Sequence, residues 1–265
     1  MKEADKLSLS ENLIFEGMTS IRAVIAAIES GNSDRRIVRC IVSEGRAQAR
    51  AKELSYIKAM SYKYGFSIEA MADEAVDSLS IGQNHGGLIL ETTARTIPPL
   101  TEDAIAKLPE NERYFVMLEG IEDPYNFGYA LRSLYASGVS AVILSPRNWM
   151  SVAGIVCRAS AGASEYLTTY IADSPSDCAA MMKANGVKIV CCDMANSVSI
   201  YDADLKKPLF LAVGGEKRGL SRELLDSADT IVRLEYGRDF PAALSAASAA
   251  SIAGFEVLRQ NSGRI

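Results

Sequence analysis

From position 113 to the end, short apolar runs alternate along the chain with segments of helical periodicity. The runs contain few polar residues, as is typical of parallel strands covered by helices on both faces. We therefore expect an α/β fold built from repeated strand–helix units. The expected strands are 114–118, 141–144, 166–171, 187–191, 209–213 and 230–234, and the expected helices are 127–137, 151–158, one from Pro175 to Gly186, 221–226 and 241–259.

The N-terminal part also alternates short apolar runs with segments of helical periodicity. Thr19 is a candidate cap for the helix expected at 21–29. A segment with three prolines and many charges follows, and it contains one short expected helix, 102–108. We predict a small α/β domain at 1–95, a linker at 96–112 and a larger domain at 113–265. In the small domain we expect strands 13–16, 37–42, 67–70 and 87–93, and helices 21–29, 46–64 and 73–80.

Composition narrows the class of protein. No apolar run approaches the ~18 residues of a membrane span, and the charged start leads into no signal segment. The five cysteines show no C-x-x-C spacing and the chain has one histidine, so we expect free core thiols, no metal site and a cytoplasmic location. A net charge of −5 argues mildly against nucleic acid. Basic residues nevertheless gather in one stretch, either as a solvated surface or as a binding patch: Arg35, Arg36, Arg39, Arg46, Arg50, Lys52, Lys58 and Lys63.

The junction between strand 114–118 and helix 127–137 carries candidate chemistry. A polar turn at the carboxyl end of a strand is where open α/β sheets bind ligands. Asn126 stands at the helix entry, and Arg132 falls between the expected core positions Leu131, Leu134 and Tyr135. The simpler alternative is a helix cap at Asn126 and a surface ion pair at Arg132.

A glycine-rich loop follows strand 209–213. Its spacing from Gly214 to Gly219 resembles a Walker loop, but Leu220 stands where the phosphate-binding lysine would be. Glu216 would also bring a negative charge to the phosphates, so a nucleoside triphosphate site is disfavoured. Glycines here allow the backbone to pass close to a ligand, or they simply form a tight turn.

Three segments together resemble the SpoU/TrmH family of RNA ribose methyltransferases. They read Asp-Pro-x-Asn-x-Gly-x-x-x-Arg from Asp123, Arg-x-Ser-x-Gly-Ala from Arg158 and Gly-x-Glu-x-x-Gly-Leu-Ser from Gly214. The resemblance implies an S-adenosyl-L-methionine-dependent RNA 2′-O-methyltransferase, a homodimer with a SPOUT trefoil knot, acting on ribosomal RNA, with transfer RNA as an alternative. It also makes domain 1–95 an L30e-like RNA-binding domain, in which His85 has a structural or RNA-contacting role.

The resemblance also implies residue roles. Arg132 would contact the RNA phosphate, and because a guanidinium is a very poor base we expect it to position the phosphate and stabilise negative charge. Asn126 would orient the ribose hydroxyl or support the cofactor loop, and Glu216 would fix Arg132 or Asn126. The implied catalytic set is Asn126, Arg132, Glu216 and Ser245, and the implied cofactor-binding set is Val213, Gly214, Gly215, Gly219, Leu234 and Leu244.

The third family signature, Ser-Leu-Asn-Val-Ser-x-Ala, is altered. Ala243 replaces its first serine and Ser245 replaces its asparagine, whereas Leu244 is retained. Either Ser245 or a neighbour, namely Tyr236, Arg238 or Asp239, supplies the missing polar group, or the chain is a catalytically impaired RNA-binding paralogue.

Overall fold

The computed structural model describes residues 13–82, 85–145 and 152–263. Contacts between residues divide the chain into two compact units. The first unit is Met1–Thr96 with Asn148–Tyr166, and the second is Ile97–Arg147 with Leu167–Ile265. The assignment of 1–95 to RNA binding and 113–265 to catalysis stays a prediction, because a grouping by contacts does not test what each part binds.

The second unit is built on a seven-stranded sheet of order β7-β6-β5-β10-β8-β11-β9, in which every pairing is parallel. The predicted strands are therefore present, and one strand that the sequence did not predict, Val198–Ser199, is added at an edge. The strands are β5 (Tyr114–Glu119), β6 (Ala141–Leu144), β7 (Thr169–Ile171), β8 (Lys188–Cys192), β9 (Val198–Ser199), β10 (Leu209–Gly214) and β11 (Thr230–Arg233).

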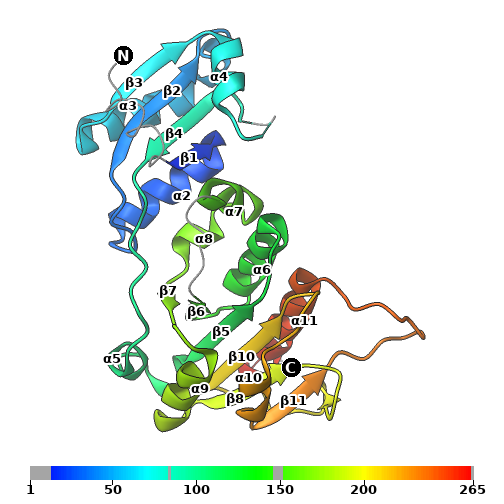
Figure 1. Ribbon diagram of the computed structural model, residues 1–265. Helices are drawn as coiled ribbons and strands as arrows, with labels where there is room; N and C mark the ends of the chain where they lie inside the picture. The colour runs from blue at the N-terminus through cyan, green and yellow to red at the C-terminus, as the bar shows by residue number, and fades with distance from the viewer. Residues whose placement is uncertain (1–12, 83–84, 146–151, 264–265) are drawn as a thin grey trace, which may run out of the picture. The chain divides into compact units, whose positions relative to one another are not determined.

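Helices cover both faces of this sheet (Figure 1). On one face, Phe115 and Phe210 join a buried cluster with Met182 and Leu224. Helices α6 (Pro124–Ala136) and α11 (Ala246–Asn261) pack against each other and cover the other face. Ser251 of α11 donates a hydrogen bond to Ser133 of α6 at 2.7 Å. The helices of the unit are α5 (Glu102–Ala106), α6 (Pro124–Ala136), α9 (Pro175–Ala184), α10 (Arg222–Asp226) and α11 (Ala246–Asn261).

The first unit has a four-stranded mixed sheet of order β1-β4-β2-β3. Its strands are β1 (Leu13–Glu16), β2 (Ile37–Ser43), β3 (Ser67–Met71) and β4 (Leu88–Thr92), and its helices are α2 (Gly17–Glu29), α3 (Ala51–Tyr64), α4 (Asp73–Leu79), α7 (Ala153–Ala159) and α8 (Ala163–Tyr166). The core of the unit includes Phe15, Ile25 and Leu90, and Cys157 of α7 is buried among them.

The segment with α7 and α8 is joined to the rest of the first unit by two ion pairs, of which one is buried. Arg35 donates to both carboxylate oxygens of Glu165, at 3.1 and 3.3 Å, and both side chains are almost fully buried. Arg158 pairs with Glu16 at 2.8 Å. Periodicity predicts elements one at a time, so it gave no indication that a segment in the middle of the chain packs with its beginning.

Several helix starts differ from the prediction, two of them because of a local cap. Helix α2 begins at Gly17 without a side-chain cap, so Thr19 lies inside it. Helix α6 begins at Pro124, because the Asp123 carboxylate caps it. Helix α11 begins only at Ala246, capped by Ser245, and not at 241. Tyr135 is 48% exposed and does not belong to the core, in contrast to the prediction.

The basic stretch is largely paired with acidic side chains. Ion pairs join Arg39 to Glu69 and Glu91, Arg46 to Asp73 and Asp77, Arg50 to Glu53, and Lys63 to Glu29. These pairs favour the structural interpretation of that stretch over a continuous RNA-binding patch. The expected free cysteines are confirmed, since all five are free and only Cys192 is partly exposed. None of the helices within the described ranges is long and apolar enough to span a membrane.

Candidate functional site

Asn126 lies in the first turn of α6, but it is not the cap. The Asp123 carboxylate takes that role and accepts the Asn126 backbone N–H at 2.7 Å, and Pro124 occupies the first helical position, where its missing N–H costs nothing. The Asn126 side chain is therefore available for another partner. Its Nδ2 donates to Glu216 Oε1 at 3.2 Å, although the two residues lie 90 positions apart.

Glu216 connects three segments of the second unit. It lies in the loop after β10, and the same Oε1 also accepts the backbone N–H of Ala246 at 2.9 Å. One carboxylate thus joins the start of α6, the glycine loop and the start of α11. Carboxylates form stronger hydrogen bonds than neutral acceptors do, so this arrangement fixes the geometry of all three.

The glycines of the loop are required by close backbone contacts. A Cβ at Gly215 would lie 2.2 Å from the carbonyl oxygen of Gly120, and one at Gly214 would lie 2.4 Å from the carbonyl carbon of Gly219. The Gly215 N–H donates to the Glu119 carbonyl at 2.7 Å. The loops after β5 and β10 are therefore in direct backbone contact, and no other residue fits at these two positions.

A cavity opens at the carboxyl ends of β8, β10 and β11. All six residues of the implied cofactor-binding set line it, and Glu216, Tyr236 and Ala243 line it with them. The sequence did not single out Cys192, Asp193, Met194, Val232, Arg233, Ala246 and Ala249, which also line it. Several of these lie at or just after the ends of parallel strands, which was the available signal for them.

Of the four implied catalytic residues, only Glu216 lines this cavity. Asn126 is joined to it by its hydrogen bond to Glu216, whereas Ser245 and Arg132 are not. Ser245 caps α11, where its Oγ accepts the Ser248 N–H at 3.2 Å, and it does not line the cavity. Arg132 is exposed on α6, and neither Glu216 nor any other described residue forms a hydrogen bond or an ion pair with it. Of the two partners expected for Glu216, the structure brings Asn126 to it and not Arg132.

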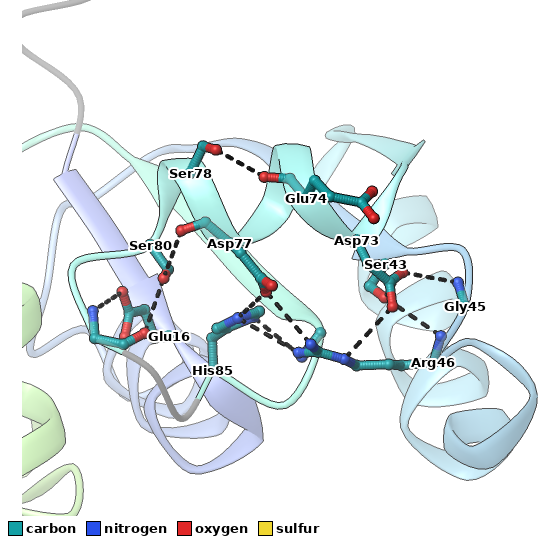
Figure 2. A network of polar contacts seen from close by, with 12 residues as sticks. Glu16, Ser43, Gly45, Arg46, Asp73, Glu74, Asp77, Ser78, Ser80 and His85 are labelled. Atoms are coloured by element: carbon teal, nitrogen blue, oxygen red, sulfur yellow. Dashed lines mark hydrogen bonds and ion pairs between the residues drawn. The ribbon is translucent and has the colours of Figure 1, made fainter.

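His85 belongs to a separate polar cluster in the first unit, shown in Figure 2. Its ring is 2% exposed; Nδ1 accepts the Gly87 N–H at 3.2 Å, so Nε2 carries the proton and donates to Asp77 at 2.8 Å. In the same cluster the Ser43 hydroxyl and the Gly45 N–H donate to Asp73 and lower the pKa of that carboxyl. Both ring nitrogens of His85 are occupied, which favours its structural role.

Comparison with known proteins identifies relatives over most of the chain. The profile of the SpoU rRNA Methylase family matches residues 113–255. The 23S rRNA (guanosine-2′-O-)-methyltransferase RlmB of Shewanella oneidensis is 27% identical over 242 residues, which is 91% of this chain and 95% of that protein. RlmB of Vibrio cholerae is 26% identical over 254 residues, 95% of this chain and 98% of that protein.

Solved structures share the fold. An RNA 2′-O ribose methyltransferase superposes with a TM-score of 0.75 at 24% identity, covering 98% of this chain and 92% of the other. The AdoMet-bound rRNA methyltransferase of Sinorhizobium meliloti gives a TM-score of 0.75 at 23% identity, covering 97% of this chain and 90% of the other. The predicted fold class is confirmed: an α/β architecture with a parallel sheet and a small N-terminal α/β part.

Proposed function

Because this chain belongs to the SpoU rRNA methylase family, we propose that it transfers a methyl group from S-adenosyl-L-methionine to a ribose 2′-hydroxyl of ribosomal RNA. Family membership confirms the resemblance identified from the sequence. The observation that carries the proposal is the cavity at the ends of β8, β10 and β11, where all six implied cofactor-binding residues meet Glu216. The relatives named above act on 23S RNA at guanosine, so we propose a guanosine of 23S RNA as the first substrate to test.

The residues of the cavity fit the cofactor chemically. Val213, Leu234 and Leu244 offer apolar surface to a nucleoside, while Gly214 and Gly215 expose backbone close to the ligand. The Glu216 carboxylate suits the positive charge of the sulfonium and ammonium groups. When bound, the cofactor supplies an electrophilic methyl group; the chain supplies binding, alignment and exclusion of water.

Asn126 and Arg132 have distinct roles in this proposal. The Asn126 amide donates one N–H to Glu216, which leaves its Oδ1 to accept a hydrogen bond from the ribose 2′-hydroxyl. Glu216 thereby positions the acceptor, and the hydroxyl oxygen is aligned for attack. Arg132 has no protein partner among the described residues and binds the phosphate next to the reacting ribose.

A second candidate is supported by the altered third signature. Ala243 has no polar side-chain atom, and the Ser245 hydroxyl is engaged in capping α11. A chain that keeps the cofactor cavity and loses turnover would be an RNA-binding paralogue. The two candidates differ in turnover and not in cofactor binding, so one experiment separates them.

That experiment is transfer of labelled methyl from S-adenosyl-L-methionine to 23S and 16S RNA from a strain poor in ribose methylation, followed by nucleoside digestion. We expect label in a 2′-O-methyl nucleoside, and Asn126→Ala should reduce it about 100-fold. Cofactor binding by calorimetry without any transfer would establish the paralogue instead. Absence of both binding and transfer from the wild-type chain would refute the proposed function.

We also propose that the protein is a homodimer that buries the outer surface of α6 and α11. These helices pack together and leave five large apolar side chains 37–50% exposed: Tyr125, Tyr129, Tyr135, Ile252 and Phe255. We expect light scattering to give the mass of a dimer, and Tyr129→Glu to give a monomer. Tyr201→Glu is the control, because Tyr201 is 56% exposed elsewhere in the second unit and should leave the dimer intact.

The remaining parts of the proposal concern location and RNA contact. We place the protein in the cytoplasm, where a ribosomal RNA substrate and five free thiols are both expected. The first unit is proposed to bind RNA outside the reacting nucleotide. A chain that begins at Ile97 lacks the four-stranded sheet of that unit and keeps only its helices α7 and α8. It should show whether RNA binding needs the sheet, provided the remaining protein retains cofactor binding.

A further inference from the structure

The segment between β11 and α11 forms a long loop, drawn in orange in Figure 1. Tyr236 and Leu244 stand at the base of this loop. The Tyr236 hydroxyl oxygen accepts the Leu244 backbone N–H at 3.0 Å, and both residues line the cofactor cavity. Two residues further along, the Ala246 N–H is bound by Glu216. Tyr236 and Glu216 therefore fix the backbone that forms this wall of the cavity.

The Tyr236 hydroxyl stands where the altered third signature has lost polar groups. Ala243 lines the cavity without a polar side-chain atom. Ser245 has a hydroxyl, but this accepts the Ser248 N–H and lies 3.0 Å from the Ser248 hydroxyl, away from the cavity lining. Tyr236 thus brings to the cavity a hydroxyl that this segment otherwise lacks there.

The proton of that hydroxyl is available. A phenol has one O–H donor and also accepts hydrogen bonds, and the Leu244 N–H uses only its accepting capacity. Across the described ranges, no protein group accepts the Tyr236 proton. The oxygen is therefore held in place while the donor is left for a ligand, an arrangement that requires little reorganisation on binding.

We propose that the Tyr236 hydroxyl donates a hydrogen bond to the nucleoside half of S-adenosyl-L-methionine. Val232, Leu234 and Leu244 line the cavity with Tyr236 and suit a neutral, planar base, whereas Glu216 suits the cationic amino-acid half. The inference rests on the proposed function and adds a binding residue to it. It also gives Tyr236 a role that neither Ala243 nor Ser245 can perform.

The test compares Tyr236→Phe with wild type by calorimetry, using S-adenosyl-L-methionine and 5′-methylthioadenosine, which lacks the amino-acid half. Loss of one neutral hydrogen bond should weaken binding of both ligands about five- to tenfold. Tyr201→Phe is the matched control, since it removes the same hydroxyl from an exposed tyrosine that does not line the cavity. This variant should bind both ligands as the wild type does. Phe240→Ala removes the ring neighbour of Tyr236, 6.3 Å away, and keeps the hydroxyl, so it should also bind normally.

The outcomes separate the two levels of inference. A wild-type protein that does not bind S-adenosyl-L-methionine refutes the proposed function. Wild-type binding with unchanged affinity in Tyr236→Phe refutes only the role of Tyr236, and a loss confined to the full cofactor refutes its placement at the nucleoside. Tyr236→Phe also removes the acceptor of the Leu244 N–H, so trypsin cleavage after Arg238 is measured in each variant to show how far the loop is loosened. If Phe240→Ala, which keeps the hydroxyl, is cleaved as fast as Tyr236→Phe and binds as weakly, Tyr236 only holds the loop.

Discussion

At the scale of single residues, α6 carries two polar side chains that the folded chain uses differently. Asn126 is bound to Glu216, so its orientation is set before any ligand arrives. Arg132 is exposed and bound to no residue that the structure describes. An arginine held by no protein group contributes little to stability, which agrees with the proposal that Arg132 binds a ligand.

Arg132→Ala should therefore separate function from stability. We expect methyl transfer to RNA to fall about 100-fold, because one charge that positions the phosphate is lost. The melting temperature and the affinity for S-adenosyl-L-methionine should stay unchanged, since Arg132 does not line the cavity and forms no hydrogen bond or ion pair with a described residue. Arg222→Ala, a change on another exposed helix, should leave transfer at the wild-type rate. Unchanged methylation by Arg132→Ala would remove Arg132 from the active site.

The buried thiols give a prediction about pH. Burial raises the pKa of Cys40, Cys157, Cys178 and Cys191 to about 12, against roughly 8.5 for a free thiol. The folded state thus favours the protonated thiols, so their contribution to stability is complete below about pH 8.5 and declines as pH rises towards 12. The free energy of unfolding in urea should fall across that range, and a quadruple change of these residues to Ala or Ser should flatten the fall. A pH dependence that the variant retains in full would assign the effect to other groups.

At the scale of elements, the sequence predicted the parallel strands well and the helix ends poorly. Apolar runs such as 114–118 and 209–213 are buried on both faces, so their pattern has few alternative explanations. Helix ends depend on single caps, and the Ser245 cap sets the start of α11 at Ala246, whereas periodicity had begun the helix at 241. The glycine loop was recognisable by its motif. Its contact with the loop after β5 was not, because Gly215 meets the backbone of Glu119 and Gly120, which lie far away in the sequence.

Helix α7 provides a test of such close packing. A Cβ at Gly154 would lie 1.9 Å from the carbonyl oxygen of Ile14 in β1. Gly154→Ala must push α7 away from β1, and we expect a loss of roughly 2 kcal/mol or more in unfolding free energy. Gly237→Ala is the matched control, because nothing lies within 4 Å of the added Cβ. Equal stability of the two variants in urea would show that α7 does not pack on β1 as described.

At the scale of the whole molecule, the order of the chain and the grouping of its contacts disagree in one place. The sequence assigned 151–166 to the larger domain, and the resemblance to the Arg-x-Ser-x-Gly-Ala segment supported that choice. The structure packs α7 and α8 with the first unit, through Cys157 in its core and Glu165 beside Arg35. A buried arginine and its partner 130 positions away leave no local pattern, which is why sequence reasoning missed this contact.

The Arg35–Glu165 pair should consequently be important for the stability of the first unit. Glu165→Gln leaves the Arg35 charge buried without its counter-ion, and removing one partner of a buried pair costs about 3–5 kcal/mol. Glu69→Gln is the matched control: its pair with Arg39 is partly exposed and should contribute at most about 1 kcal/mol. Urea unfolding of both variants measures the difference. Because the Glu165 pair lies outside the cofactor cavity, the folded fraction of Glu165→Gln should still bind S-adenosyl-L-methionine with wild-type affinity. Similar unfolding energies for the two variants would mean that α8 is not anchored to the first unit by this charge.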